Sequence, residues 1–207
     1  MEAHEIAEQI HEHAHPEAHA AVPAHDWFRR LTGIYVGVVA MLLAIATLGG
    51  AEATKEMLNA NIHASDTYAF YQAKYIRQLN YQTAAEQLDL LAAAAPGLSP
   101  ERLGKLDKLV KGYRDTAARY ESEPANGNGK KELLAAAKDW EHRRDHAAAQ
   151  IPNFEYAEAL FQIAIVLGSV AIVAASPWLL GVSGVLAVGA LLLTANGYFL
   201  LVPLAHG

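Results

Sequence analysis

The chain contains no cysteine among its 207 residues, which excludes disulfide bonds, thiolate metal sites and a cysteine nucleophile. Basic residues are also few, and the net charge of −6 argues against a nucleic-acid-binding protein, which normally presents a basic face. Two motifs of catalysis are missing as well: Gly-x-Ser-x-Gly and a glycine-rich phosphate loop. These absences predict a protein that is not an enzyme and that needs no cofactor.

Charge is missing over one long stretch, because residues 159–205 contain no Asp, Glu, Lys or Arg. The hydrocarbon core of a bilayer is about 30 Å thick and takes roughly 20 apolar residues per helix. The 47 residues of this stretch therefore fit two membrane spans, and Ser176-Pro177-Trp178 supplies a turn between them. The pattern predicts transmembrane helices over residues 153–175 and 179–203.

A second uncharged run covers residues 31–51 and follows Trp27-Phe28-Arg29-Arg30, a sequence typical of a membrane interface. At 21 residues the run is longer than the apolar core of a signal peptide, so we expect an uncleaved transmembrane helix over residues 27–50. Gly33 and Gly37 have the spacing that lets two helix backbones pack closely. Among the few polar residues of the spans, Gln162 and Asn196 are predicted to form interhelical hydrogen bonds.

The charged middle of the chain, residues 51–152, is predicted to be helical and to lie outside the membrane. No Pro or Gly occurs between residues 51 and 95, so a helix should continue straight out of the first span for about 66 Å. Pro96-Gly97 ends it, and the segment 123–129 separates two returning helices of about 31 and 32 Å. The matching lengths predict a long antiparallel helical hairpin, coiled-coil-like, with a broken return leg. We then expect Ile151-Pro152-Asn153 to interrupt the helix before the second span, with Asn153 as a possible N-cap.

Each leg of this hairpin carries a stripe of residues with helical spacing. On the outgoing leg the stripe has alternating steps of four and three and consists of Leu58, Ile62, Ser65, Ala69, Gln72, Ile76, Leu79, Thr83, Glu86 and Leu90. On the return legs the stripes consist of Leu103, Leu106, Val110, Tyr113, Ala117 and Tyr120, and of Leu133, Ala137, Trp140 and Ala147. These residues are predicted to pack against partner helices.

The segment from Ser65 to Gln78 resembles a signature of one bacterial membrane family, the family of the domain of unknown function 4337. That signature is Trp-x-x-Tyr-Gln-Ala-Lys-x-x-Lys/Arg, and it aligns with Tyr68, Tyr71, Gln72, Lys74 and Arg77, so that Tyr68 replaces the family's Trp. The resemblance covers about residues 30–203, including the arrangement of one span, a helical region and two closing spans. It implies a multi-pass protein of the bacterial inner membrane and carries no known reaction.

These five signature residues have two interpretations. Lys74 and Arg77 could donate hydrogen bonds to an anion or to a partner protein, near the predicted break at 124–129. Alternatively, the aromatic residues around them form a packing seam between hairpin legs or between subunits, with the cations paired to acids. The sequence favours the packing seam.

The first 26 residues form a separate tail rich in His and Glu, which is expected to be disordered because it cannot bury a core. Its histidines at His11, His13, His15 and His19 are candidate metal ligands. Pro16 interrupts any helix that would align them, so a solvated tail is the favoured interpretation.

Taken together, the sequence predicts an all-α integral membrane protein with three transmembrane helices. The projecting helical domain should mediate self-assembly, making a homo-oligomer, or docking of a partner protein. Two alternatives are a homo-oligomeric pore lined by the first span and metal handling through the His-rich tail. Arg29 and Arg30 favour a cytoplasmic N-terminus.

Overall fold

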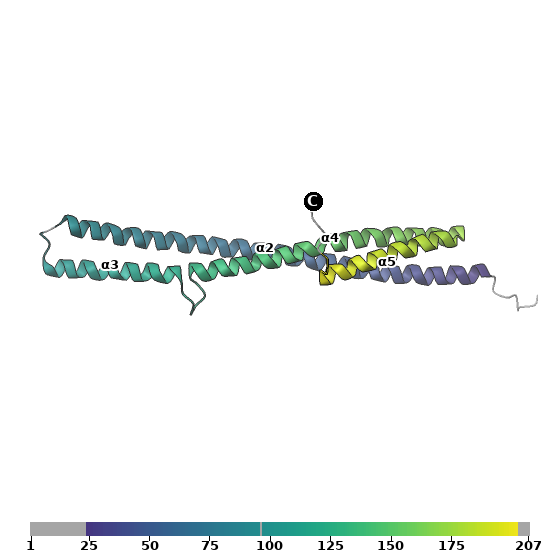
Figure 1. Ribbon diagram of the computed structural model, residues 1–207, viewed down its shortest axis with the longest axis horizontal. Helices are drawn as coiled ribbons and strands as arrows, with labels where there is room; N and C mark the ends of the chain where they lie inside the picture. Colours follow the sequence, from purple (N-terminus) through teal and green to yellow (C-terminus); the bar gives the residue numbers. More distant parts are fainter. Residues whose placement is uncertain (1–23, 96, 203–207) are drawn as a thin grey trace, which may run out of the picture. The chain divides into compact units, whose positions relative to one another are not determined.

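The computed structural model describes residues 24–95 and 97–202, and the candidate metal ligands His11, His13, His15 and His19 lie outside these residues. The described residues form four α-helices and no strand: α2 (Ala24–Ala94), α3 (Pro100–Glu121), α4 (Lys130–Ala174) and α5 (Pro177–Phe199) (Figure 1). Of these helices, α2, α4 and α5 are long and apolar enough to cross a membrane. The all-α class predicted from the sequence is therefore confirmed.

Helix α2 is a single element of 71 residues, which confirms that the first apolar run and the charged helix after it are continuous. No Pro or Gly interrupts it after Gly50, and Pro96 lies just beyond its end at Ala94. The turn predicted at Ser176 is also present: Ala175 has a φ of 47°, and Pro177 begins α5.

The predicted break at Ile151-Pro152-Asn153 is wrong, because α4 runs through Pro152 without interruption. Asn153 is therefore not an N-cap but a buried residue inside the helix, where its Oδ1 accepts a hydrogen bond of 2.6 Å from Asn196 Nδ2. A proline inside a helix removes one backbone hydrogen bond, and packing of the residues that follow it offsets this cost. Helix α5 ends at Phe199, earlier than the predicted residue 203, because Leu200 adopts a φ of 46°.

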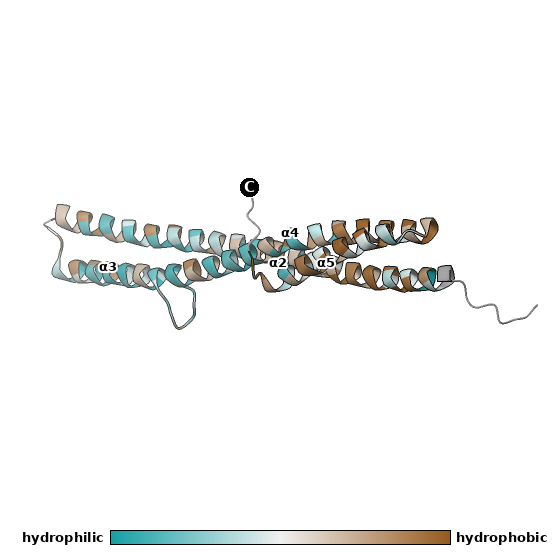
Figure 2. Ribbon diagram, turned by 45° about the vertical axis from the view of Figure 1, so that its right-hand side comes forward, coloured by the Kyte–Doolittle hydropathy of each residue, from teal (hydrophilic) through white to brown (hydrophobic). Residues whose placement is uncertain are grey.

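The described chain divides into two compact units. Unit 1 comprises α2 up to Leu48, α4 from Asn153 and α5, and unit 2 comprises α2 from Gly49, α3 and α4 up to Pro152. Figure 2 shows that hydrophobic residues dominate the helices of unit 1, whereas hydrophilic residues are frequent on α3 and on the unit 2 part of α4.

The core of unit 1 is built largely from small side chains. Its fully buried members are Val39, Ala46, Ala157, Phe161, Ala164, Ala187 and Ala190. Polar groups inside it are satisfied across helices: the hydroxyls of Tyr35 and Ser183 are 2.8 Å apart, and Ser183 Oγ donates to the carbonyl oxygen of Ala164 at 2.6 Å. Small residues allow close approach of the three helices, and the hydrogen bonds between them fix their register.

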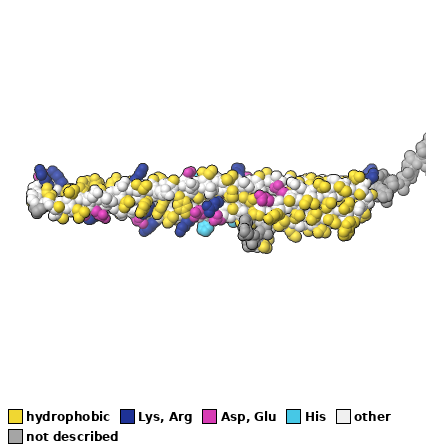
Figure 3. Space-filling view, turned by 90° about the horizontal axis from the view of Figure 1, so that it is seen from above, with side chains coloured by type: hydrophobic (Ala, Val, Ile, Leu, Met, Phe, Trp, Pro, Cys, Tyr) yellow, Lys and Arg dark blue, Asp and Glu magenta, His cyan; other side chains and the backbone are white. Residues whose placement is uncertain are grey.

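The outer surface of unit 1 is apolar. Large aliphatic side chains cover it, among them Met41, Leu48, Val166, Val173, Val185 and Leu192 (Figure 3). Gly33 and Gly37 also lie on this outer surface, since a Cβ atom added at either one would meet no atom within 4 Å. Their predicted role in close packing therefore has no partner within the described part of this chain.

In unit 2, helix α3 and the first part of α4 both lie along α2 (Figure 1). The stripes predicted for the two return legs do face α2: Val110, Ala117, Leu133, Ala137 and Ala147 are buried. Trp140 stacks on His63 of α2 with ring centroids 4.5 Å apart.

The stripe predicted for α2, in contrast, faces away from the other helices, because all ten of its residues are exposed. The packed face of α2 lies two residues further along and consists of Ala60, Ala64, Thr67, Tyr71, Lys74, Gln78, Tyr81, Ala85, Leu88 and Ala92, all buried or half-buried. A step of two residues turns the helix by about 200°, so the exposed stripe is on nearly the opposite side. In unit 2, α2 thus packs through alanines and aromatic or polar side chains and leaves most of its bulky aliphatic ones exposed.

Candidate functional site

The strongest candidate site in unit 2 is the point where α3 ends and α4 begins beside the middle of α2. Gln78 of α2 is only 6% exposed, and its Nε2 donates to the carbonyl oxygen of Ala117 at 3.3 Å and to Glu121 Oε2 at 3.0 Å. Lys130 Nζ donates to Gln78 Oε1 at 2.7 Å and to Glu121 Oε2 at 3.0 Å. The triad Gln78–Glu121–Lys130 therefore joins one residue from each of three helices by hydrogen bonds.

The ionisation of the triad follows from these contacts. The hydrogen bond from Gln78, together with the hydrogen bond and charge of Lys130, lowers the pKa of Glu121 below its ordinary value of 4.5. The side chain of Lys130 is 13% exposed, so its charge is largely removed from water and compensated by the carboxylate. The arrangement links three helices through a largely buried ammonium group and a carboxylate that is 40% exposed.

Aromatic rings surround the triad and supply a second set of contacts to its cations. Lys130 Nζ lies 4.8 Å from the ring centroid of Tyr75 and 6.0 Å from that of Tyr71. Lys74 Nζ lies 5.0 Å from the ring centroid of Tyr120. Tyr81 packs on Tyr120 with a centroid distance of 5.8 Å. Ammonium groups over ring faces gain cation–π attraction, which stabilises the junction without an acidic partner for Lys74.

The loop between α3 and α4 is fastened by Glu132 in the first turn of α4. Glu132 Oε1 accepts a hydrogen bond of 2.6 Å from Ser122 Oγ, and its Oε2 accepts one of 3.2 Å from the backbone N–H of Glu123. The bond from Ser122 is the largest reason why the pKa of Glu132 is lowered. Gly129 has no room for a Cβ atom, which would collide with Glu132 Oε2 and with the backbone of Glu123.

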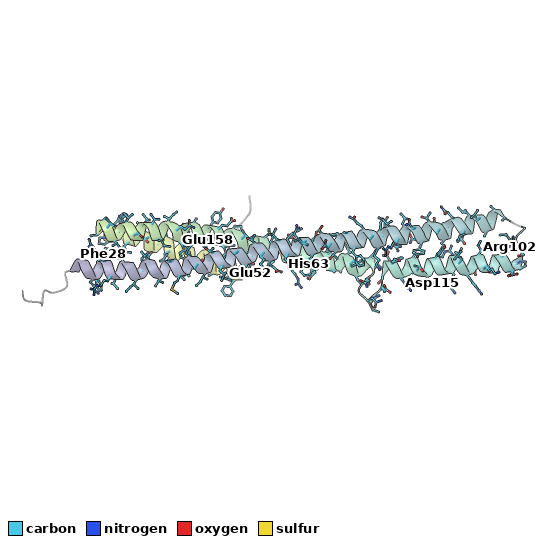
Figure 4. All side chains as sticks on the ribbon, turned by 180° about the vertical axis from the view of Figure 1, so that it is seen from behind. Phe28, Glu52, His63, Arg102, Asp115 and Glu158 are labelled. Carbon is cyan, nitrogen blue, oxygen red and sulfur yellow. The ribbon has the colours of Figure 1, made fainter. Side chains whose placement is uncertain are left out.

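An open groove of about 460 Å³ borders the junction and is lined by Arg77, Asn80, Tyr81 and Tyr120. Within the described residues Arg77 has no ion-pair partner, so it is the signature cation that remains available to an anionic group. Figure 4 labels two further charged side chains of α3, Arg102 and Asp115, both of which are exposed.

The structure brings three of the five signature residues together at this junction: Tyr71 and Lys74 pack within it, and Arg77 lines the groove. Tyr68 faces α4 instead, where partial burial and a hydrogen bond to Glu141 raise the pKa of its hydroxyl. Gln72 is exposed on the other side of α2. Lys130 and Glu121 were not among the predicted site residues, although their position on either side of the 123–129 break was a usable signal.

The side chains at this junction are arranged for noncovalent contacts. In the parts of the chain that the structure describes, no three His, Asp or Glu side chains are placed to hold a metal ion together. The junction combines a buried ion pair, aromatic faces and one exposed guanidinium, an arrangement that fixes helices and can contact an acidic group.

Comparison with known proteins supports the resemblance noted from the signature. No curated protein and no solved structure shows a significant match to the chain. The family model described as Domain of unknown function (DUF4337) matches residues 28–200, which include all of α3, α4 and α5 and all of α2 except its first four residues. The chain therefore belongs to the DUF4337 family.

Proposed function

We propose that the protein is a non-enzymatic integral membrane protein, anchored by the three helical segments of unit 1. Unit 2 is then a helical domain outside the bilayer that mediates self-assembly or docking of a partner protein. The observation that carries this proposal is the distribution of side chains in unit 1, where many large aliphatic residues lie outside while Thr32, Asn153, Ser183 and Thr194 are buried.

This distribution is the reverse of what water favours. Val173 is 83% exposed, and Val185 and Leu192 are similarly uncovered, whereas Thr32, Asn153 and Ser183 are buried. Soluble proteins rarely expose a contiguous apolar surface of this kind, while lipid-facing helices require one. The interhelical hydrogen bonds of Ser183 and Asn196 fit the same environment, because a polar group in hydrocarbon needs a partner.

Unit 2 supports a role in assembly because its packing leaves a bulky aliphatic face of α2 uncovered. Leu58, Ile62, Ile76, Leu79 and Leu90 are all roughly half exposed or more. A helical domain held beside a membrane with such a face is suited to contact another helix. The pore lined by the first span and metal handling by the His-rich tail stay predictions, and no feature of the two units favours either.

Fractionation tests the membrane anchor. Membranes from cells expressing the full chain are washed with alkaline carbonate and sedimented without detergent. The protein should stay in the pellet and enter the supernatant only when detergent is added. Release by carbonate alone would contradict the proposal.

The location and orientation are part of the same proposal. A bacterial inner membrane follows from the family resemblance, and Arg29 and Arg30 favour a cytoplasmic N-terminus, which places unit 2 and the C-terminus on the outer side. A reporter enzyme active only outside the cytoplasm, fused after Gly207, should therefore be active. An inactive fusion beside an active cytoplasmic reporter at the same position would reverse the orientation.

A further inference from the structure

We propose that the exposed stripe of α2 in unit 2 is the self-association surface of the protein and pairs with the same stripe of a second copy, parallel and in register. The inference rests on the proposed function, and it names the partner and the residues that meet. We call this surface the outer stripe: Leu58, Ile62, Ser65, Ala69, Gln72, Ile76, Leu79, Thr83, Glu86 and Leu90.

The first argument is the spacing of the outer stripe. Its ten residues follow alternating steps of four and three without a gap, which is the heptad pattern of two helices that wrap around each other. Within unit 2, α2 packs through a separate heptad set, the packed face described above, so the outer stripe is not needed for folding of unit 2. A second, independent heptad on the same helix calls for a second helix.

The residue types select the kind of partner. In the heptad frame, Ile62 and Ile76 fall at a positions, and Leu58 and Leu79 fall at d positions. Isoleucine at a with leucine at d is the combination that favours a parallel two-stranded coiled coil. In register, each of these side chains meets its own counterpart, so the surface is self-complementary and a second copy is the partner that fits it.

The polar residues of the outer stripe and the residues that flank it bear on whether two copies can pair in register. Gln72 would face Gln72 of the partner, and an amide pair at one core layer fixes alignment at some cost in stability. The flanking e and g positions that face each other across a parallel pair bring no two like charges together; they are Asn61 with Asp66, Tyr68 with Ala73, Tyr75 with Asn80, and Gln82 with Gln87. Glu86 is the one charged core member; in register it would face Glu86 of the partner, and this like-charge contact, one turn from the end of the stripe, lowers the stability of the pair.

The size of the surface fits an association that the membrane assists. From Leu58 to Leu90 the stripe is about 48 Å long, and at a width of about 10 Å it covers roughly 1,000 Å² over two copies. That area is at the lower limit of specific interfaces, about 1,000–1,200 Å². The anchors of unit 1 would hold all copies in one orientation and raise their effective concentration, which favours parallel pairing.

Disulfide cross-linking of the full chain in native membranes tests the proposal, because the natural chain has no cysteine to interfere. Single-cysteine variants Leu79→Cys and Leu90→Cys lie on the outer stripe. Leu91→Cys is the matched control, since Leu91 is 62% exposed and Leu90 is 70% exposed but Leu91 lies outside the heptad frame.

Under mild oxidation, Leu79→Cys and Leu90→Cys should form covalent dimers at least ~10-fold faster than Leu91→Cys, because a disulfide needs Cα atoms closer than about 7 Å. Equal rates for Leu90→Cys and Leu91→Cys would overturn the proposal. A second variant, Ile76→Lys, tests it without a covalent bond and places a charge at an exposed position that the fold of one chain does not use.

Ile76→Lys should lower the self-association of labelled protein in lipid vesicles at least ~10-fold, by like-charge repulsion at a core layer, while carbonate extraction is unchanged. Undiminished association of Ile76→Lys, in a protein that remains in the membrane pellet, would overturn the outer stripe and leave the membrane anchor intact. Release of the unaltered protein by carbonate would overturn the proposed function itself.

Discussion

Replacing Lys130 by Met should loosen the junction between α3 and α4 more than any other single loss of charge in unit 2. Methionine keeps an unbranched apolar chain of similar length, so the packing of the stem against the aromatic rings is largely preserved. What the substitution removes is the ammonium group, with its hydrogen bonds to Gln78 and Glu121 and its contact with Tyr75.

The magnitude follows from these contacts. The bond to the neutral Gln78 amide contributes about 1 kcal/mol, and the contact with the Tyr75 ring about 0.5–1 kcal/mol. The ion pair with Glu121 is discounted to about 1 kcal/mol, because the Glu121 side chain is 40% exposed and screened by water. Together, these losses should lower the local stability of the junction by about 2–3 kcal/mol and leave the stability of unit 1 unchanged.

Hydrogen exchange of the full chain in detergent, analysed by mass spectrometry of peptides, measures this loss locally. Amides of residues 117–123 and 130–134 should exchange roughly 30- to 150-fold faster in Lys130→Met, since each 1.4 kcal/mol is a factor of ten. Lys131→Met is the control: Lys131 is 69% exposed and 4.0 Å from Glu121, so its loss should change exchange by about twofold or less. Equal effects of the two substitutions would refute the triad as the fastening of this junction.

Three further outcomes are expected. Gly197→Ala should destabilise unit 1 by about 1–3 kcal/mol in thermal unfolding, because its Cβ would lie 2.8 Å from the fully buried ring of Phe154. Asn196→Leu should lower the unfolding midpoint by the equivalent of about 0.6–1.7 kcal/mol, since it removes the hydrogen bond to Asn153. Lowering the pH below 4.5 should reduce the protection of amides at the α3–α4 junction relative to their intrinsic exchange rate at the same pH: the pKa of Glu121 is lowered on folding, so its contribution to stability is present above 4.5 and is lost as the pH falls through the lower folded pKa.

Each of these has a matched control. Gly184→Ala should be neutral or slightly stabilising, because an added Cβ there meets no atom within 4 Å. Gln162→Leu should leave the unfolding of unit 1 unchanged, since Gln162 is exposed and makes no hydrogen bond within the described chain. Glu121→Gln should reduce the acid response of the junction to the part contributed by Glu132, whose pKa is also lowered, whereas Glu101→Gln, at a solvated surface position, should leave the full response in place. If a control substitution changes the measured property as much as the substitution it is paired with, the corresponding contact is refuted.

The positions of the helices were largely predictable from hydropathy and from helix-breaking residues. The uncharged runs located the apolar parts of α2, α4 and α5. Pro96 marked the end of α2, Pro100 the start of α3, and the segment 123–129 the end of α3 and the start of α4. Pro152 was the exception. A proline breaks a helix only when the lost hydrogen bond is not outweighed by packing, and burial of Asn153 and Phe154 directly after it depends on α5, which no local pattern reveals.

The packed face of α2 was predicted on the wrong side for a physical reason. Sequence patterns weigh bulky aliphatic residues most heavily, so Leu58, Ile62 and Leu79 suggested the seam. Unit 2 instead packs on Ala60, Ala64 and Ala85, because small side chains permit close helix approach, and Tyr81 packs against Tyr113 and Tyr120 of α3. The predicted stripes of α3 and of the unit 2 part of α4 include the buried residues Val110, Ala117, Leu133, Ala137 and Ala147, but Leu103 at the start of the α3 stripe is 42% exposed.

For the signature residues as well, the sequence predicted a position along the helix but not the contacts made with other helices. Lys74 was expected near the break between the return legs, and it does lie over the ring of Tyr120 just before that break. Its contact with an aromatic ring could not be predicted, because Tyr120 lies on α3 and Glu121, the next residue of α3, is engaged by Gln78 and Lys130.

The account depends most on unit 1 lying in lipid, and spin-label accessibility in reconstituted vesicles tests this directly. Labels at Val166→Cys and Val185→Cys, on the apolar outer surface of α4 and α5, should collide with oxygen more often than with a water-soluble nickel complex. A label at Lys108→Cys on α3 should show the opposite preference. Nickel accessibility at Val166→Cys and Val185→Cys equal to that at Lys108→Cys would contradict the membrane anchor.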